Sequence, residues 1–169
     1  NPKINLYGDA YKLELGVTVN YLSDIENSDG KFNIYPDINA SYRLLDDQVI
    51  AFTQIGGGLD MNSLQQFADE NVFLAPAIDV QPTDRSLDAQ LGLKGKITNN
   101  LGYKIYGGYK KENNRYFYTK DVGRIIASQA PKDELGNVFY TEYADLGTTF
   151  FGGSLSVDVS SKFNLTLSG

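Results

Sequence analysis

The chain has 169 residues, with 15 Lys and Arg against 21 Asp and Glu, so its formal net charge is -6. It contains no Cys and no His, which excludes disulfides, thiolate metal sites and imidazole chemistry. The acidic balance argues against a nucleic-acid partner. The 12 Tyr and 17 Gly favour an all-β fold over a helical one.

Alternation of apolar and polar residues predicts the first strands. From Tyr11 to Tyr21 every odd position is apolar or aromatic and every even position is polar or glycine. The even positions from Phe32 to Leu44 repeat the pattern, interrupted only at Pro36, where we expect a bulge or an unpaired edge position. A third strand is expected from about Gln48 to Gly57, and Lys3 to Gly8 is a candidate for an additional one.

Four further strands are predicted in the second half, giving seven in all, or eight with the N-terminal candidate. They run from Leu87 to Ile97, Leu101 to Tyr109, Phe151 to Val159 and Phe163 to Ser168. Asn99-Asn100 joins two of them and suits a two-residue hairpin turn that needs positive φ.

Long and short connections alternate along the chain. Long loops are expected at 24–30, 59–85 and 112–147, and short turns at about 46–47, 99–100 and 160–162. This order places every long loop at one end of an up-and-down sheet, which is typical of outer-membrane β-barrels. The long loops with Lys31 and Arg85 hold 6 basic and 14 acidic residues, and the remainder holds 9 and 7. The acidity is therefore concentrated at one end.

The length of the first strand fits a membrane. Tyr11 to Tyr21 spans roughly 33 Å, or about 25 Å at a tilt near 40°, which is the height of the apolar band of such barrels. Tyr at both ends matches aromatic girdles at two membrane interfaces. We interpret the chain as all-β, an antiparallel up-and-down transmembrane β-barrel in contact with outer-membrane lipid. The alternative is a soluble sandwich or lipocalin-like barrel, whose apolar residues face an interior core.

Residues 1–169 are expected to form a segment of a larger barrel. The alternation runs to Gly169 without a terminal aromatic residue, and seven strands is the safest count. An open sheet would leave unpaired strand edges in hydrocarbon.

One segment, 55–74, resembles the barrel of Bacteroidota outer-membrane proteins of the TonB-dependent receptor type. Its sequence IGGGLDMNSLQQFADENVFL is similar to a strand ending in Gly, a short helical stretch and an Asn-Pro-Phe-Leu-like tetrapeptide, with Val72 where the family has Pro. The similarity continues through Leu91 to Ile97, Leu101 to Tyr109 and Tyr116 to Asp121, and covers about half the chain. The resemblance implies a 22-stranded barrel with a plugged lumen, a TonB-type energiser and a surface lipoprotein partner. Neither a plug domain nor a TonB box occurs in these 169 residues.

Four lysines fall on the polar face of the predicted hairpin and are expected to line the lumen: Lys94, Lys96, Lys104 and Lys110. Two interpretations are open. They attract anionic solutes or an acidic plug surface, or they belong to a solvated polar wall balanced by Glu14, Asp88 and Asp158, which we favour.

The longest loop opens with three aromatic residues, Tyr116, Phe117 and Tyr118. They are candidates for stacking on a loop-bound ligand such as a sugar ring, or for the outer interfacial girdle, the interpretation we favour. A helix is predicted from Ser63 to Asp69 with Asn62 or Ser63 as N-cap, and Leu64 and Phe67 would fold it onto the loop or the barrel mouth.

Two other motifs have modest implications. The acidic residues of the 24–30 loop do not follow the EF-hand spacing, so a polar turn is favoured over a calcium site. Gly56-Gly57-Gly58 lacks a phosphate-loop context and indicates flexibility or a bulge.

The sequence supports three functions, all without enzymatic activity, cofactor or metal. The first is a barrel in the cell outer membrane that contributes to TonB-dependent-receptor-like solute uptake. The second is a non-transporting outer-membrane barrel that acts as adhesin, structural anchor or subunit of a surface complex. The third is a soluble lipocalin-like binder.

Overall fold

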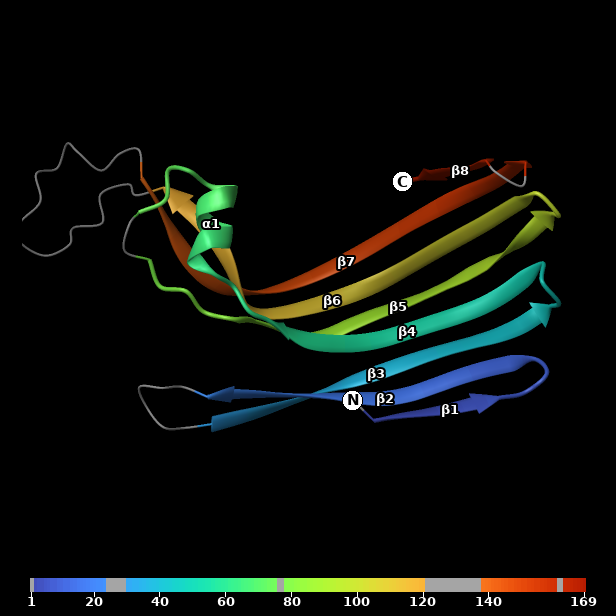
Figure 1. The fold of residues 1–169 in the computed structure, drawn as a ribbon, viewed down its shortest axis with the longest axis horizontal. Helices are drawn as coiled ribbons and strands as arrows, with labels where there is room; N and C mark the ends of the chain where they lie inside the picture. Colours follow the sequence, from blue (N-terminus) through green and yellow to red (C-terminus); the bar gives the residue numbers. More distant parts are fainter. Residues whose placement is uncertain (1, 24–29, 76–77, 121–137, 161–162) are drawn as a thin grey trace, which may run out of the picture. The chain divides into compact units, whose positions relative to one another are not determined.

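Eight strands in chain order form one antiparallel sheet in the computed structural model, which describes residues 2–23, 30–75, 78–120, 138–160 and 163–169 (Figure 1). The elements are β1 Lys3–Tyr7, β2 Tyr11–Ser23, β3 Gly30–Leu45, β4 Val49–Asp60, α1 Leu64–Glu70, β5 Thr83–Thr98, β6 Leu101–Lys120, β7 Phe139–Ser160 and β8 Phe163–Ser168. The all-β antiparallel sheet is confirmed, with β1 and β8 as its two edges. Within the described ranges, no helix has both the length and the apolar character to cross a bilayer.

The chain divides into two compact units. The sheet unit comprises Asn1–Gly58, Arg85–Lys111 and Gly147–Gly169. The helix unit comprises Leu59–Asp84 and Glu112–Leu146, and it contains α1.

Several strands extend into segments that we expected to be loop, β6 and β7 furthest of all. β6 continues to Lys120 and β7 begins at Phe139, so strand occupies both ends of 112–147, and β5 begins at Thr83. The aromatic and β-branched residues there favour strand, but they do not alternate with polar ones. The expected loop at 24–30 and the turn at 160–162 fall mainly on residues outside the described ranges.

In the register of β2 and β3, aromatic residues lie opposite aromatic residues and polar residues lie opposite polar ones. Tyr11 lies opposite Tyr42 and Tyr21 opposite Phe32, whereas the polar Glu14 lies opposite Asn39. The same register passes through Pro36 without a bulge. Pairing of β3 with β4 begins at Ile38, so Pro36 has no paired partner in β4. Of the two expectations for Pro36, a bulge or an unpaired edge position, the second is confirmed. The bulge occurs instead between Arg43 and Leu45.

The turns between β3 and β4 and between β5 and β6 lie where the sequence predicted them, but the φ angles predicted for Asn99-Asn100 differ. Asn99-Asn100 connects β5 to β6, as expected. Among the described non-glycine residues, however, positive φ occurs at Asp46 (40°) and Asn114 (58°), so the prediction of positive φ at Asn99-Asn100 was wrong. Asp46 adopts this conformation in the short turn between β3 and β4.

The apolar face of β2 and β3 is the more exposed face. Along β2 the apolar residues Leu15, Val17, Val19 and Tyr21 are exposed, while Glu14, Gly16, Thr18 and Asn20 are half-buried; at the start of the strand, Leu13 is half-buried and Lys12 is exposed. Val19 is 49% exposed, whereas Tyr35, opposite Thr18 on the polar face, is 4% exposed. A soluble sheet with one wet face has the opposite distribution, because its apolar residues pack into the core.

The glycine run at 56–58 lies inside β4 and provides a matched pair of variants. A Cβ on Gly57 would lie 2.7 Å from Tyr35 Cδ1 and 2.8 Å from the Arg85 carbonyl oxygen, whereas a Cβ on Gly56 meets nothing within 4 Å. We expect Gly57→Ala to lower the free energy of unfolding by about 1–3 kcal/mol through overpacking. Gly56→Ala should leave it nearly unchanged in denaturant titrations, and equal losses in the two variants would contradict the packing.

Candidate functional site

Two lysines converge on one aromatic ring on the polar face of the sheet unit. The Nζ atoms of Lys94 in β5 and Lys104 in β6 lie 5.5 and 5.0 Å from the ring centroid of Phe52 in β4. Lys104 Nζ also lies 4.8 Å from the Tyr106 ring. We call these four residues the dilysine site.

The other two predicted lumen lysines are not part of the dilysine site. Lys96 is exposed and its backbone N–H donates to the Asp47 carbonyl oxygen, 3.0 Å away. Lys110 is half-buried further along β6. The sequence did not identify Phe52, because β4 belongs to a different hairpin and its register against β5 has no local sequence signal. Whether the four lysines line a lumen stays a prediction.

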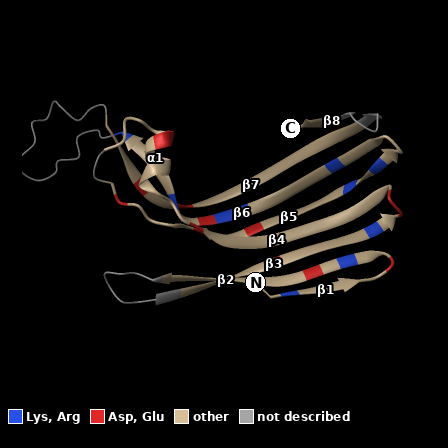
Figure 2. Cartoon of the chain, in the orientation of Figure 1, with Lys and Arg blue, Asp and Glu red and all other residues tan. Residues whose placement is uncertain are grey.

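The carboxylates expected to balance these lysines pair with other cations. Glu14 lies 2.8 Å from Lys12 Nζ, and Asp88 lies 3.9 Å from the Arg85 guanidinium. The side chain of the third carboxylate, Asp158, is outside the described part. Within that part, no carboxylate lies within 4 Å of Lys94 or Lys104, and Figure 2 shows basic residues toward the short-turn ends of β5 and β6.

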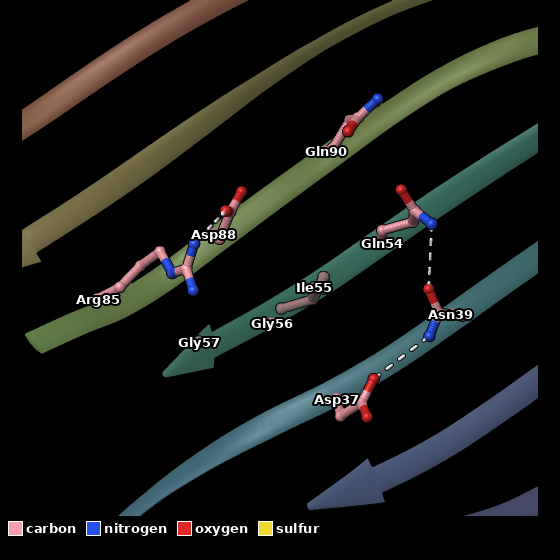
Figure 3. A pocket seen from close by; sticks show the side chains of 9 residues that line it. All are labelled: Asp37, Asn39, Gln54, Ile55, Gly56, Gly57, Arg85, Asp88 and Gln90. Carbon is pink, nitrogen blue, oxygen red and sulfur yellow. Dashed lines mark hydrogen bonds and ion pairs between the residues drawn. The ribbon is translucent and has the colours of Figure 1, made fainter. Parts of the chain in front are cut away.

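A polar cleft of about 330 Å³ lies on β3, β4 and β5, two of which also carry residues of the dilysine site (Figure 3). Three of its amide and carboxylate side chains form a hydrogen-bonded row. Gln54 Nε2 donates to Asn39 Oδ1 (3.2 Å), and Asn39 Nδ2 donates to Asp37 Oδ1 (3.3 Å). Asp37 also lies 2.7 Å from Lys3 Nζ. The charged groups of the cleft therefore already have partners, Asp37 in Lys3 outside the cleft and Asp88 in Arg85 within it.

In the helix unit, α1 forms as its sequence predicts and docks through one aromatic residue. Ser63 is the N-cap, and its Oγ accepts from the Gln66 backbone N–H at 3.1 Å. Phe67 is fully buried, with its ring centroid 4.6 Å from that of Tyr116 and 6.2 Å from that of Tyr118. These contacts attach α1 to β6.

Glu70 at the end of α1 joins the same two tyrosines. The Tyr118 hydroxyl donates to Glu70 Oε2 at 2.8 Å, and the Tyr116 hydroxyl lies 3.0 Å from both carboxylate oxygens. Of the three aromatic residues considered for ligand stacking or for an interfacial girdle, Tyr116 and Tyr118 are thus in contact with α1, and Phe117 is exposed. Their role in ligand binding or in a girdle stays a prediction.

These hydrogen bonds shift the ionisation of the groups involved. Donation by Gln66 and then by Tyr118 lowers the pKa of Glu70, while burial followed by the bond to Glu70 raises the pKa of Tyr118. We expect spectrophotometric tyrosine titration to show that Tyr118 ionises at a higher pH than an exposed tyrosine. The variant Glu70→Gln should shift this ionisation to a lower pH. Unchanged titration in Glu70→Gln would contradict this contact.

The lowered pKa of Glu70 also makes the docking of α1 dependent on pH. Because the folded-state pKa of Glu70 is the lower one, its stabilising contribution is complete above the ordinary carboxyl pKa and is lost as the pH falls through the lowered value. Docking of α1 should therefore weaken in acid, where Glu70 is protonated, and again in strong alkali, where Tyr118 with its raised pKa ionises.

A second network shapes the neighbouring strands of the helix unit. The Asn114 backbone N–H donates to Asp145 Oδ1, and its Nδ2 donates to Gln81 Oε1 and to the Pro82 carbonyl oxygen, each at 3.0 Å. These bonds support the left-handed backbone at Asn114. A bridge between Leu74 and Phe139 links the two long connections.

No metal site emerges from the described residues, in which no group of three or more carboxylates is arranged around a common point. The acidic residues considered for calcium, from Asp24 to Asp29, lie outside the described ranges.

No protein family, curated protein or solved structure matches the chain.

Proposed function

We propose that the sheet unit forms part of the wall of a β-barrel in the cell outer membrane, and that this barrel contributes to solute uptake in the manner of TonB-dependent receptors. The observation that carries the proposal is the exposed apolar face of β2 and β3 opposite a less exposed polar face. Lipid stabilises such an apolar face, and a polar lumen accommodates the other.

The exposed face also has the layered composition of a membrane-spanning surface. Aromatic pairs lie at both ends of the β2–β3 hairpin, Tyr11 with Tyr42 and Tyr21 with Phe32, whose ring centroids are 4.7 Å apart. Aliphatic residues fill the intervening band. Aromatic rings are favoured at membrane interfaces, where one end is apolar and the other wet.

The proposal requires both edges of the sheet to be covered. Unpaired backbone groups of β1 and β8 would be costly in hydrocarbon, so the proposed barrel needs these edges covered, either by further strands or by each other. A plug domain, a TonB-type energiser and a surface lipoprotein are the partners that follow from the resemblance at 55–74. The helix at Leu64–Glu70 falls where that resemblance places a short helical stretch.

The two alternative functions, a soluble binder and a non-transporting barrel, would require different surfaces of the sheet. A lipocalin-like binder would bury the apolar face, which is opposite to the exposure along β2. A non-transporting barrel shares the same lipid face but needs no solute path through its polar side.

Reconstitution of the intact protein into phospholipid vesicles tests the proposal. We expect the protein to remain with the vesicles after alkaline washing, to retain strand signal in circular dichroism and to permit entry of small polar solutes. A folded monomer that stays in solution without lipid or detergent would contradict both membrane functions. Stable insertion without solute entry would favour the non-transporting barrel.

A further inference from the structure

We infer that the dilysine site binds a small solute through a dianionic group, of which a phosphate monoester is the best match. The inference names a solute class for the proposed uptake function and in that respect rests on it. Anion binding itself depends only on the arrangement of Lys94, Lys104, Phe52 and Tyr106.

The two ammonium groups of the dilysine site repel each other. Because both lie near the Phe52 centroid, their Nζ atoms are at most 10.5 Å apart, the sum of the two distances. Like charges within about 10 Å, one Debye length in 0.1 M salt, still repel one another unless they are partnered. Glu14, Asp37 and Asp88 pair with other cations, so an anion would relieve this repulsion.

The aromatic ring of the dilysine site has a fixed position. Phe52 is only 9% exposed, and a Cβ on Gly92 would lie 2.9 Å from its Cε1 and Cζ atoms. Gly92 thus lets the ring lie close against β5. A ring held in this way attracts both ammonium groups through its face and keeps them together on one side of the sheet.

The two ammonium groups also determine the choice of anion. A phosphate monoester carries roughly -1.5 to -2 charges at neutral pH and three acceptor oxygens. Each lysine ammonium offers three donors. Two ammonium groups therefore match one phosphate in charge and in hydrogen bonding, whereas a monocarboxylate would neutralise only one of them.

Thermal unfolding of the intact protein with inorganic phosphate as the probe tests the inference, with sodium chloride and acetate at the same ionic strength as comparisons. We expect phosphate to raise the unfolding midpoint of the wild type in a saturable manner, because a ligand that binds only the folded state stabilises it. Acetate and chloride should have much smaller effects. Equal stabilisation by acetate would overturn the inference.

Matched lysine variants locate the site. The double variant Lys94→Gln, Lys104→Gln should bind phosphate at least about tenfold more weakly, since it loses two charge-assisted contacts. Lys12→Gln is the control, because that lysine is on the same face but is already paired with Glu14. It should bind within about twofold of the wild type. Equal losses in the control and the double variant, or full binding by the double variant, would overturn the inference.

Further outcomes separate this inference from the proposed function and from an acidic protein partner. Vesicle insertion without phosphate binding would refute the dilysine site alone. Phosphate binding by a folded monomer free of lipid would leave the site standing and refute the membrane barrel. Binding of polyglutamate but not phosphate would overturn the solute assignment in favour of an acidic protein surface.

Discussion

Leu15→Arg should destabilise the protein in lipid by about 2–4 kcal/mol, the cost of a cationic side chain near the bilayer midplane on the lipid face of a barrel. Leu15 lies near the middle of the band between Tyr11 and Tyr21, with Ile38 opposite it. In a water-exposed sheet the same change would cost little, since surface substitutions are usually within about 0.5 kcal/mol. The measurement is denaturant unfolding of the protein reconstituted in phospholipid.

Thr18→Arg is the matched control for that change. Thr18 lies on the same strand but on the polar face, opposite Tyr35. We expect a much smaller loss there, because a lumen side keeps the charge hydrated. Equal losses at both positions, or none at Leu15, would contradict a lipid-facing apolar surface.

Phe67→Ala should release α1 from the helix unit. Phe67 is fully buried against Tyr116 and Tyr118, and truncation of a buried phenylalanine costs about 3–5 kcal/mol. A helix of seven residues is too short to persist without tertiary packing. We expect hydrogen exchange of the α1 amides to accelerate strongly, while exchange in β2 and β3 stays unchanged.

Leu64→Ala separates the buried contact from helix propensity. Leu64 belongs to the same helix but is 52% exposed, and alanine is at least as good a helix former. Exchange in α1 should change little in this variant. Acceleration similar to that of Phe67→Ala would show that α1 is not held by the Phe67 contact.

The sequence predicted those strands in which one face is apolar and the other polar, because this difference sets the order of residue types along the strand. β2 and β3 separate an apolar face from a polar one, so period-2 alternation identified both strands and their faces. The Ser63 N-cap was predictable because capping is a local interaction. The end of β6 was missed because Tyr116 and Tyr118 pack against Phe67 of α1 while Phe117 points away, so aromatic residues lie on both faces of the strand and simple alternation is lost.

The candidate sites depended on register, which the sequence does not reveal. Alternation placed Lys94 and Lys104 on one face, but their meeting at Phe52 requires the alignment of β4, β5 and β6. The expected partners Glu14 and Asp88 had the right charge and the right face. Each forms an ion pair with a different cation, Glu14 with Lys12 and Asp88 with Arg85, and neither pairs with the dilysine site.

The central claim is that the exposed apolar face of the sheet is in contact with lipid. Because the chain has no cysteine, single cysteines at positions 15 to 20 of β2 can be labelled one at a time with an environment-sensitive fluorophore in the reconstituted protein. We predict quenching by spin-labelled acyl chains at Leu15, Val17 and Val19, and quenching by aqueous iodide at Gly16, Thr18 and Asn20. Iodide quenching at all six positions, or lipid quenching at the even ones, would contradict the account.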